Sequence, residues 1–393
     1  MVVVIVQYSG NRSGSGLSGL LLANGLREAG WETHVAFGFS GPLVGRYKEN
    51  GHITHVVPHK NWLRRDCTHQ FAKDVWLEWR KASAFGALIE EVRPDVVYLN
   101  TVASLAGAVA ARRQGVPCVW HLREMFADVG GEMHVPRWAI PLVRWVIRLH
   151  ADQLVANSTA TAHNLMGKFG GDIEVVPNAV RAAFFEEDRS QEKTRIAFDL
   201  PCDGPVVGVP GTLRPMKGHL FFFDAVAPML RERGNLQVAV TGDGENAFVE
   251  RLKAKLETLS VREQVHFLGW VEDMAAFYRA CDVVCIPSRA EPFGRTAIEA
   301  FAVGTPVVAS AVGGLQDIVE NEKTGLLVPY DDEQALAGSV QRLLETPNLR
   351  HTLRTNARQE AEKRYHEQVY KNRIARLVDD VVNIQRSAEQ DVT

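Results

Sequence analysis

The sequence lacks the features that mark secreted, membrane-spanning and nucleic-acid-binding proteins. Its cysteines are few and scattered, at Cys67, Cys118, Cys202, Cys281 and Cys285, with no Cys-x-x-Cys pair to indicate a disulfide framework or a zinc knuckle. No apolar run reaches the roughly 18 residues of a membrane span, and the apolar N-terminal stretch has no basic leader or cleavage site. The net charge of −3 argues against nucleic acid as the main partner. We therefore expect a soluble, cytoplasmic protein that binds no nucleic acid.

A glycine-rich turn near the N-terminus lacks the acidic residue that a dinucleotide-binding site needs. Residues 14–19 read GSGLSG, between the apolar run of residues 1–9 and a leucine-rich stretch with helical spacing. In Rossmann enzymes with this spacing, a carboxylate about 20 positions on, at the end of the second strand, binds a ribose hydroxyl. The second strand here, THVAFGFSG, has Phe37, Gly38 and Phe39 at that place. The turn therefore predicts an approach to an anion, but not a nicotinamide site.

Strand-like and helix-like segments alternate along the chain, and the alternation restarts near its middle. The first half contains the runs VVVIVQY, THVAFGF, PDVVYLN, VPCVWHL, DQLVANS and IEVVPNA. After the charged stretch EEDRSQEKTR, the runs are PVVGVPG, LQVAVTG, VHFLG, DVVCIPS and TPVVASA. The length of 393 residues suits two domains, so we predict an α/β protein with two doubly wound, Rossmann-like domains at residues 1–180 and 181–364. Open parallel sheets bind ligands at the carboxyl ends of their strands, so we expect the domains to face a central cleft.

The most informative stretch, residues 288–329, carries two glutamates around a predicted helix start. Glu291 lies in the loop after DVVCIP, and Glu299 lies within the helix that begins around residues 293–295. A carboxylate can accept two hydroxyl hydrogens at once, so the pair suits a ligand with two diols. The N–H groups of a helix start favour anions or hydroxyl oxygens, and here they belong to Phe293, Gly294, Arg295 and Thr296. A phosphorylated sugar meets both demands; the alternative is a solvated helix whose acidic residues bind nothing.

The same stretch resembles the family 4 glycosyltransferases, which are retaining enzymes of the GT-B fold. Their signature is two glutamates around Phe-Gly, spaced as Glu291 and Glu299 are, followed by G-x-P-V-V-A-S, two glycines and T-G-x-L-V. The resemblance covers nearly the whole chain, with VPNAV, GTLRPMKG, TGDGE and VHFLGWV in the expected order. It implies transfer of a hexose-type sugar from a UDP- or GDP-sugar to a hydroxyl of a glycan, lipid-linked or small-molecule acceptor. It also implies a C-terminal helix, residues 365–393, that returns to the first domain.

Two cations in GTLRPMKG are suited to a diphosphate. Arg214 and Lys217 follow a predicted strand in one turn, where both can reach the same diphosphate. The motif Asp-x-Asp, through which nucleotide-sugar enzymes of the other main fold hold a divalent ion, does not occur. We therefore expect no metal ion and no other cofactor, with the leaving-group charge met by these cations and by helix N-termini. The resemblance places Gly14 and Gly16 opposite the donor phosphates, with Ser13 where many members have glycine.

Further site residues are expected at other strand ends. His121 ends the strand in VWHLREMF, where the resemblance implies a histidine that contacts the donor sugar and stabilises an oxocarbenium-like transition state. The alternative is a structural histidine. Asn100 and Thr101 are expected on the acceptor side, and backbone groups near Leu268 and Trp270 are expected to contact the base.

The resemblance implies front-face attack with retention, in which the leaving phosphate oxygen takes the acceptor proton. A double displacement through Glu291 is the competing route, although we interpret this residue as a contact to a sugar hydroxyl. Other activities remain open on the same fold. They are a nucleotide-sugar epimerase, a phosphorylase, for which no pyridoxal phosphate lysine can be placed, and a protein that binds nucleotide sugars without transfer.

Two segments of the first half interleave cations with aromatic side chains. The first is PRWAIPLVRWVIRLH, residues 136–150, and the second is residues 60–81. Their members are Arg137, Trp138, Arg144, Trp145 and Arg148 in the first segment, and Trp62, Trp76 and Trp79 in the second. The first 185 residues hold 19 Lys and Arg against 15 Asp and Glu. We predict peripheral contact of the first domain with the inner face of an anionic membrane; the alternative is an ordinary helix packed on the sheet.

Overall fold

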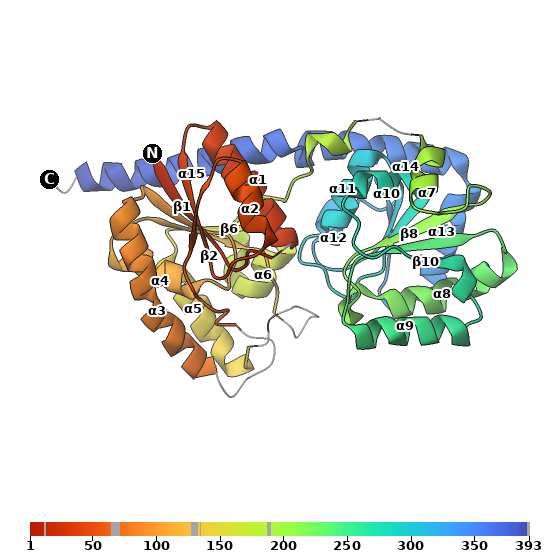
Figure 1. The fold of residues 1–393 in the computed structure, drawn as a ribbon, viewed down its shortest axis with the longest axis horizontal. Helices are drawn as coiled ribbons and strands as arrows, with labels where there is room; N and C mark the ends of the chain where they lie inside the picture. The colour runs from red at the N-terminus through yellow and green to blue at the C-terminus, as the bar shows by residue number, and fades with distance from the viewer. Residues whose placement is uncertain (12, 64–70, 127–132, 134, 187–189, 391–393) are drawn as a thin grey trace. The chain divides into compact units, whose positions relative to one another are not determined.

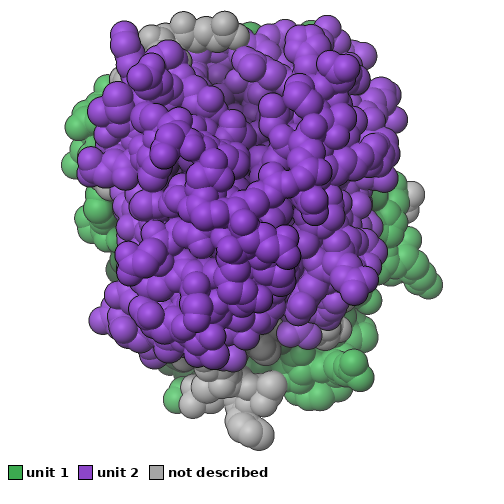
Figure 2. Space-filling model, turned by 90° about the vertical axis from the view of Figure 1, so that its right-hand side faces the viewer, with its two compact units in different colours: residues 1–179, 367–393 green, residues 180–366 purple. Residues whose placement is uncertain are grey.

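The chain forms two compact units (Figures 1 and 2). The structure is a computed structural model, and it describes residues 1–11, 13–63, 71–126, 133, 135–186 and 190–390. Unit 1 comprises residues 1–179 together with 367–393, and unit 2 comprises residues 180–366. The breaks expected from the sequence were at 180/181 and 364/365. The chain thus enters unit 2 and then returns to complete unit 1.

Unit 1 is built on a parallel sheet of seven strands. In the order β3-β2-β1-β4-β5-β6-β7, these are Ile53–Val56, Glu32–Phe37, Val2–Gln7, Val96–Leu99, Cys118–Leu122, Gln153–Ala156 and Glu174–Val175. The inner strands are apolar and rich in β-branched residues, as expected for strands covered on both faces. Along β1, Val4 and Val6 enter the core on one face, whereas Val3 and Ile5 enter the core on the other.

Helices cover both faces of this sheet (Figure 1). They are α1 (Gly14–Glu28), α2 (Pro42–Glu49), α3 (Phe71–Val92), α4 (Leu105–Arg113), α5 (Ile140–His150), α6 (Thr159–Met166) and α15 (Glu367–Gln390). One core contains side chains of α3, α4 and α5, and the other contains side chains of α1 and α15. Helix α15 buries Ile374 and Val378 in that second core. The C-terminal helix is therefore a structural part of unit 1.

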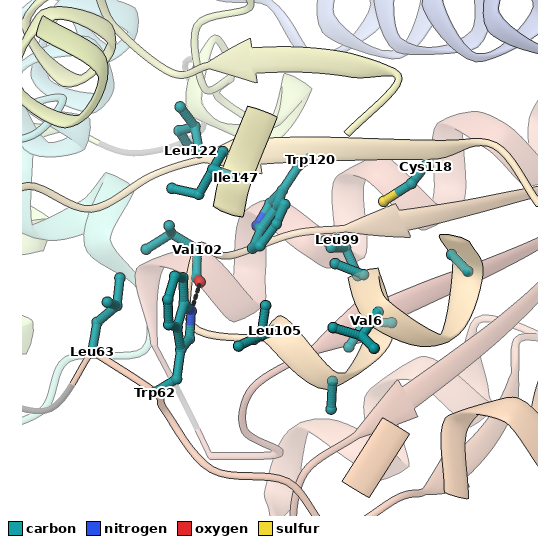
Figure 3. Close-up of a cluster of buried hydrophobic side chains, with 14 of the residues drawn as sticks. Val6, Trp62, Leu63, Leu99, Val102, Leu105, Cys118, Trp120, Leu122 and Ile147 are labelled. Atoms are coloured by element: carbon teal, nitrogen blue, oxygen red, sulfur yellow. Dashed lines mark hydrogen bonds between the residues drawn. The ribbon is translucent and has the colours of Figure 1, made fainter. Parts of the chain in front are cut away.

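Two buried indole groups hold the loops that follow β3 and β4 (Figure 3). Trp62, in the loop after β3, donates a hydrogen bond from Nε1 to the carbonyl oxygen of Val102 at 2.8 Å. Trp120 on β5 donates from Nε1 to the carbonyl oxygen of Thr101 at 2.9 Å. Leu63 is buried in the same cluster. Apolar packing and satisfied indole donors thus fix the backbone at the carboxyl end of these strands.

Unit 2 repeats the architecture with six parallel strands. In the order β10-β9-β8-β11-β12-β13, these are Val265–Phe267, Gln237–Thr241, Val206–Pro210, Val283–Ile286, Val307–Ser310 and Leu326–Val328. The helices are α7 (Gln191–Ala197), α8 (His219–Glu232), α9 (Asn246–Thr258), α10 (Met274–Ala280), α11 (Arg295–Val303), α12 (Leu315–Ile318), α13 (Glu333–Glu345) and α14 (Pro347–Glu360). One core contains residues of α10 and α11, and the other contains residues of α8, α9 and α13.

The two parallel sheets with helices on both faces confirm the predicted α/β fold class of two doubly wound, Rossmann-like domains. Within the described part of the chain, none of the helices combines the length and the apolar content needed to cross a lipid bilayer.

Candidate functional site

The loops at the carboxyl ends of the unit 2 strands are joined by backbone hydrogen bonds. These loops carry the segments that the sequence singled out. The bonds run from Leu213 N to Asp243 O at 2.9 Å, Gly242 N to Gly269 O at 2.7 Å, Arg289 N to Met216 O at 2.8 Å, and Gly314 N to Glu291 O at 2.8 Å. The loops after β8, β9, β10, β11 and β12 therefore form one connected rim.

Two glycines in this rim have backbone conformations that other residues rarely adopt. Gly218 has φ +73°, and a Cβ atom there would lie 1.8 Å from the carbonyl oxygen of Pro287. Gly294 has φ +106°, and its Cβ would lie 2.7 Å from Cδ2 of Leu315. Both positions require glycine for conformation and for space. They bring the loop of Lys217 against the loop after β11 and set the start of α11.

Lys217 and Glu291 form a close ion pair in this rim. Lys217 Nζ lies 2.6 Å from Glu291 Oε2, although 74 residues separate the two in the chain. Ser288 Oγ donates a second hydrogen bond to Oε2, at 3.2 Å. Glu291 is almost fully buried, whereas Lys217 is partly exposed. Arg214 is exposed and directly precedes the 3₁₀ turn Pro215–Lys217. The predicted cations thus lie in one turn, and one of them meets the first glutamate of the signature.

The second glutamate is held by a cation and a phenol. Helix α11 begins at Arg295, as expected, and Arg295 Nε donates to Glu299 Oε1 at 2.8 Å, one helical turn away. Tyr278 OH donates to Glu299 Oε2 at 3.0 Å. Burial, reinforced by the adjacent Glu299 carboxylate, raises the pKa of Tyr278, so the phenol stays protonated and remains a donor. Each carboxylate oxygen accepts one bond here and has a further lone pair.

The remaining predicted residues of unit 2 contribute in different ways. The Leu268 N–H donates to Val240 O at 2.9 Å, so that group is already committed to the loop. Trp270 is exposed beside it. The Phe293 side chain is buried and packs edge-on against Tyr365, with ring centroids 6.3 Å apart. Thr296 is half-buried in the first turn of α11. Phe293 is therefore a core residue whose backbone lies at the helix start.

In unit 1, a buried guanidinium connects several of the predicted positions. Arg123 Nε donates to Asn100 Oδ1 at 2.8 Å, and Asn100 Nδ2 donates to the carbonyl oxygen of Ser15 at 3.1 Å. Arg123 also donates to Asn178 Oδ1 and, at 3.0 Å, to Tyr370 OH on α15. Through these bonds one side chain ties the loops after β4 and β5 to α1 and to the C-terminal helix.

His121 lies inside unit 1 and has no exposed surface. Its Nδ1 is 2.7 Å from Tyr98 OH and 3.2 Å from Arg123 Nη2. Burial, with the positive charge of Arg123, lowers the pKa of His121, so the ring is neutral near pH 7. Nε2 has no hydrogen-bond partner among the described residues. Thr101 donates from Oγ1 to Glu124 Oε1 at 2.5 Å and is also buried.

The glycine-rich turn GSGLSG forms the N-terminus of α1. Ser13 caps the helix and accepts a hydrogen bond from Gly16 N at 3.1 Å. Gly14 is exposed, and a Cβ there would meet nothing within 4 Å. Gly16 is buried, with a Cβ position 2.4 Å from Leu43 Cδ1. The two glycines therefore differ: packing requires glycine at position 16, whereas the exposed position 14 has space for a side chain.

The aromatic and basic segments of unit 1 differ in part from the expected membrane face. Trp138 and Trp145 are 70% and 59% exposed, as expected. Trp62 is only 1% exposed because it packs in the core, so grouping it with the surface tryptophans was wrong. Arg144 turns back to donate from Nε to the carbonyl oxygen of Leu165 at 2.7 Å, and it does not belong to an outward cationic face. Residues 64–70 of the second segment lie outside the described residues.

Sequence reasoning missed three residues that organise these sites: Tyr278, Arg123 and Tyr370. Tyr278 stands in the apolar helix MAAFYRA, and Arg123 directly follows the apolar run of β5. A polar or charged side chain at such a place is a usable signal, because burial demands a partner. For Tyr370 no such signal exists, because its partner Arg123 is 247 residues away in the chain. Among the described residues, no group of three or more His, Cys, Asp or Glu is suited to a metal ion.

Comparison with known families matches both halves of the chain. Residues 13–184 match the family described as Glycosyltransferase Family 4. Residues 190–360 match the family described as Glycosyl transferases group 1. The second match contains Lys217, Glu291 and Glu299, and the first contains Gly14 and His121.

Two sequence relatives and two solved structures are similar to this chain over most of its length. The D-inositol 3-phosphate glycosyltransferase of Jonesia denitrificans is 35% identical over 290 residues, which span 68% of this chain and 68% of that protein. For the enzyme of the same name from Salinispora arenicola, the identity is 35%, over 65% of this chain and 62% of that protein. Anabaena Alr3699/HepE, solved in complex with UDP, has a TM-score of 0.82 and 23% identity, covering 97% of this chain and 100% of that chain. The sucrose-phosphate synthase of Thermosynechococcus elongatus has a TM-score of 0.78 and 21% identity, covering 98% of this chain and 100% of that one.

Proposed function

The chain belongs to the family 4 glycosyltransferases of the GT-B fold, and from that membership we propose that it transfers a hexose-type sugar, with retention and without a metal ion, from a nucleotide diphosphate sugar to an acceptor hydroxyl. The acceptor is a glycan, a lipid-linked sugar or a small molecule. The names of the sequence relatives, D-inositol 3-phosphate glycosyltransferases, support a hydroxylated acceptor. The complex of Anabaena Alr3699/HepE with UDP supports a UDP-sugar as the first donor to test.

The observation that carries the proposal is the pair of carboxylate–cation contacts in the unit 2 rim. Lys217 meets Glu291 at 2.6 Å, and Arg295 meets Glu299 at 2.8 Å. A nucleotide diphosphate sugar has anionic phosphates flanked by two sets of hydroxyl groups. Cations suit the phosphates and carboxylates accept bonds from the hydroxyls, so a rim that carries both kinds of group matches the composition of this ligand.

We assign the diphosphate to Arg214 and Lys217 and the ribose diol to Glu299. Arginine and lysine near the bridging oxygens stabilise the charge that develops on the leaving group, and preorganised cations do so without a metal. The ribose hydroxyls donate to the second lone pairs of Glu299, while Arg295 and Tyr278 keep that carboxylate in place.

For Glu291 we propose a contact with a hydroxyl of the transferred sugar. Both of its described side-chain bonds fall on Oε2, so Oε1 is the oxygen that we assign to the sugar. A carboxylate held by an ammonium at 2.6 Å is a poor nucleophile, which favours front-face attack over double displacement. For His121 we propose a contact with the donor sugar through Nε2, the ring atom without a partner among the described residues. The buried position of this ring requires neighbouring side chains to move when the donor binds.

The proposal is tested by incubating the chain with UDP- and GDP-sugars and a panel of hydroxylated acceptors. Release of nucleotide together with a glycosylated product supports transfer. Conversion of the donor to an isomer without release indicates an epimerase, and binding without any conversion indicates a protein that does not catalyse transfer. Glu299→Gln should raise the donor KM by about tenfold or more, because the ribose loses a charged acceptor. Glu320→Gln, on an exposed carboxylate of the same unit with a lysine partner, serves as the matched control.

We further propose that unit 1 contacts anionic membranes through exposed tryptophans beside cations. Trp138 and Trp145 are exposed, and the exposed Arg148 of the same segment lies over the Phe169 ring at 4.5 Å. Arg80 and Arg113 stack over Trp76 and Trp79, with 4.8 and 5.0 Å between guanidinium and ring centroid. Aromatic rings at the headgroup level with arginines among anionic lipids are a favourable arrangement.

The membrane proposal is tested by co-sedimentation with anionic and neutral vesicles at low and high salt. We expect binding to anionic vesicles that weakens with salt, and that weakens further in the double variant Trp138→Ala, Trp145→Ala. Equal absence of binding to both kinds of vesicle would overturn the proposal. The variant Trp270→Ala, which removes an exposed tryptophan of unit 2, is the control for loss of aromatic surface in general.

A further inference from the structure

A cavity of about 360 Å³ lies at the carboxyl edge of the unit 1 sheet, apart from the residues assigned above. Its lining comes from the ends of three neighbouring strands and from α3. The lining residues are Tyr8 after β1, Gly38 and Phe39 after β2, Pro58, His59, Lys60 and Asn61 after β3, and Lys81 on α3. This volume is in the range of sites that bind small molecules, and the carboxyl ends of parallel strands are where such sites form.

The walls of the cavity are held by buried contacts. His59 is buried, with Nδ1 2.9 Å from the carbonyl oxygen of Val57 and Nε2 3.0 Å from Ser104 Oγ. Three residues further on, Trp62 anchors the same loop in the core (Figure 3). Tyr8 and Phe39 pack edge-on, with ring centroids 5.6 Å apart. Buried contacts therefore hold the loop after β3 that carries Lys60 and Asn61.

Gly38, which lines the cavity, has no room for a side chain. A Cβ atom there would lie 2.6 Å from the carbonyl oxygen of Tyr8 and 3.0 Å from the His59 ring. This is the place at the end of the second strand where a dinucleotide-binding enzyme has its carboxylate. The chain has glycine at that position and has lysines across the cavity. The electrostatic preference is thus the opposite of a site where a carboxylate binds the ribose hydroxyls of NAD.

The charged groups at the cavity leave a positive balance. Lys81 Nζ lies 2.8 Å from Oε1 of the buried Glu78, and the Lys60 backbone N–H donates to the same oxygen at 2.9 Å. Burial lowers the pKa of His59, so its ring contributes no charge near neutral pH. The charges of Glu78 and Lys81 compensate each other, so the exposed ammonium of Lys60 leaves the cavity with a net positive charge. Asn61 adds an amide next to it.

We propose that this pocket binds the anionic group, a phosphate or a carboxylate, of the hydroxylated acceptor. The inference rests on the proposed transferase function. Lys60 supplies the net positive charge, since Lys81 is paired with Glu78, and the rings of Tyr8 and Phe39 supply an apolar wall for the acceptor's carbon skeleton. The same chemistry is found in a soluble sugar or polyol phosphate and in a phosphate-bearing lipid headgroup.

The experiment compares acceptors that differ only in the phosphate: inositol 3-phosphate with inositol, and glucose 6-phosphate with glucose. Asn61→Asp adds a negative charge without a change of volume and retains an oxygen for the 2.8 Å bond from Leu63 N. Lys60→Gln removes the cation and retains its backbone bond. In both variants we expect the kcat/KM ratio of phosphorylated over unphosphorylated acceptor to fall by about tenfold or more. Lys48→Gln, on an exposed lysine of α2 in the same unit, should leave the ratio unchanged.

Direct binding separates a failure of the pocket from a failure of the transferase proposal. Calorimetry of the full chain with inositol 3-phosphate, in the absence of donor, should show binding that Asn61→Asp weakens about tenfold, while its unfolding temperature stays near that of the parent. If no nucleotide sugar is turned over, this binding alone supports the pocket. The parent chain could instead bind only vesicles that contain phosphatidylinositol, and Asn61→Asp could lose that binding. This result also supports the pocket and assigns the phosphate to a lipid. No binding of any phosphorylated probe, or equal binding by the parent chain and both variants, overturns the inference.

Discussion

At the residue scale, Lys217 makes the contact on which the proposed chemistry depends most. Its ammonium is already directed at the rim, 2.6 Å from Glu291, and donor phosphates would compete with that carboxylate. We predict that Lys217→Ala lowers kcat by about 100-fold or more, because the leaving diphosphate loses a preorganised cation. Steady-state kinetics with donor at saturation measures this.

The control for this prediction is a lysine with the same type of partner but no place in the rim. Lys323 pairs with Glu320 at 2.8 Å on the exposed surface of unit 2. Lys323→Ala should leave kcat unchanged, because this lysine lies outside the rim and its exposed pair contributes little to stability. Full activity of Lys217→Ala at saturating donor would contradict the assignment.

His219 provides a prediction for pH dependence. It is buried next to Lys217, and both ring nitrogens lack hydrogen-bond partners among the described residues. Burial, with the charge of Lys217, lowers the pKa of His219 to about 4. Below about pH 6.5 this histidine therefore binds a proton in the unfolded chain but not in the folded chain. The free energy of unfolding falls as the pH drops from 6.5 towards 4. For this histidine we expect a loss of about 2 kcal/mol at pH 5 relative to pH 7.5.

Urea unfolding of unit 2 at the two pH values measures this effect. In His219→Leu, the difference between the two free energies of unfolding should shrink by about 2 kcal/mol. The exposed His351, on α14 of the same unit, is the matched control, and His351→Leu should retain the dependence of the parent chain. An unchanged pH dependence in His219→Leu would contradict this prediction. It would mean that the ring is already protonated in the folded chain, or that another group causes the pH dependence of stability.

At the element scale, helix α15 determines whether unit 1 is complete. Ile374 is fully buried against the α1 side of the sheet, whereas Ile384 on the same helix is 70% exposed. We predict that Ile374→Ala costs about 3 kcal/mol of stability, from the lost transfer free energy and the cavity left behind. Ile384→Ala should cost less than about 0.5 kcal/mol. Thermal unfolding followed separately for the two units should show that the loss falls on unit 1, and a shift confined to unit 2 would contradict this view.

Elements were predictable from the sequence where local pattern and burial agree. The strands of both sheets are β-branched runs, and the start of α11 follows a glycine whose φ of +106° only glycine tolerates well. The pattern was misleading for Trp62 and Arg144. An aromatic residue among cations predicts an exposed face, but Trp62 follows β3 by a few residues and turns into the core. Arg144 donates a hydrogen bond to the carbonyl oxygen of Leu165 on α6, so its guanidinium does not point outward.

At the scale of the whole molecule, the proposed chemistry uses cations in place of a metal ion. Arg214 and Lys217 carry that role in the proposal. We predict that transfer activity is undiminished in excess chelator. Activity measured before and after exhaustive treatment with EDTA tests this. A loss that only Mg²⁺ or Mn²⁺ restores would contradict the metal-free proposal.

By itself, the sequence determined the two parallel α/β units, their order, and the family signature around Glu291 and Glu299. These follow from local pattern, because β-branched runs form strands and glycines permit particular turns wherever they occur. Only the tertiary structure decided which polar groups meet: Lys217 with Glu291 across 74 residues, and Arg123 with Tyr370 across 247. Such contacts depend on how elements pack, and a linear pattern contains no information on which distant side chain will satisfy a buried charge. For the same reason, the lysine-lined cavity beside Gly38 became visible only when the ends of three strands had been brought to one edge of a sheet.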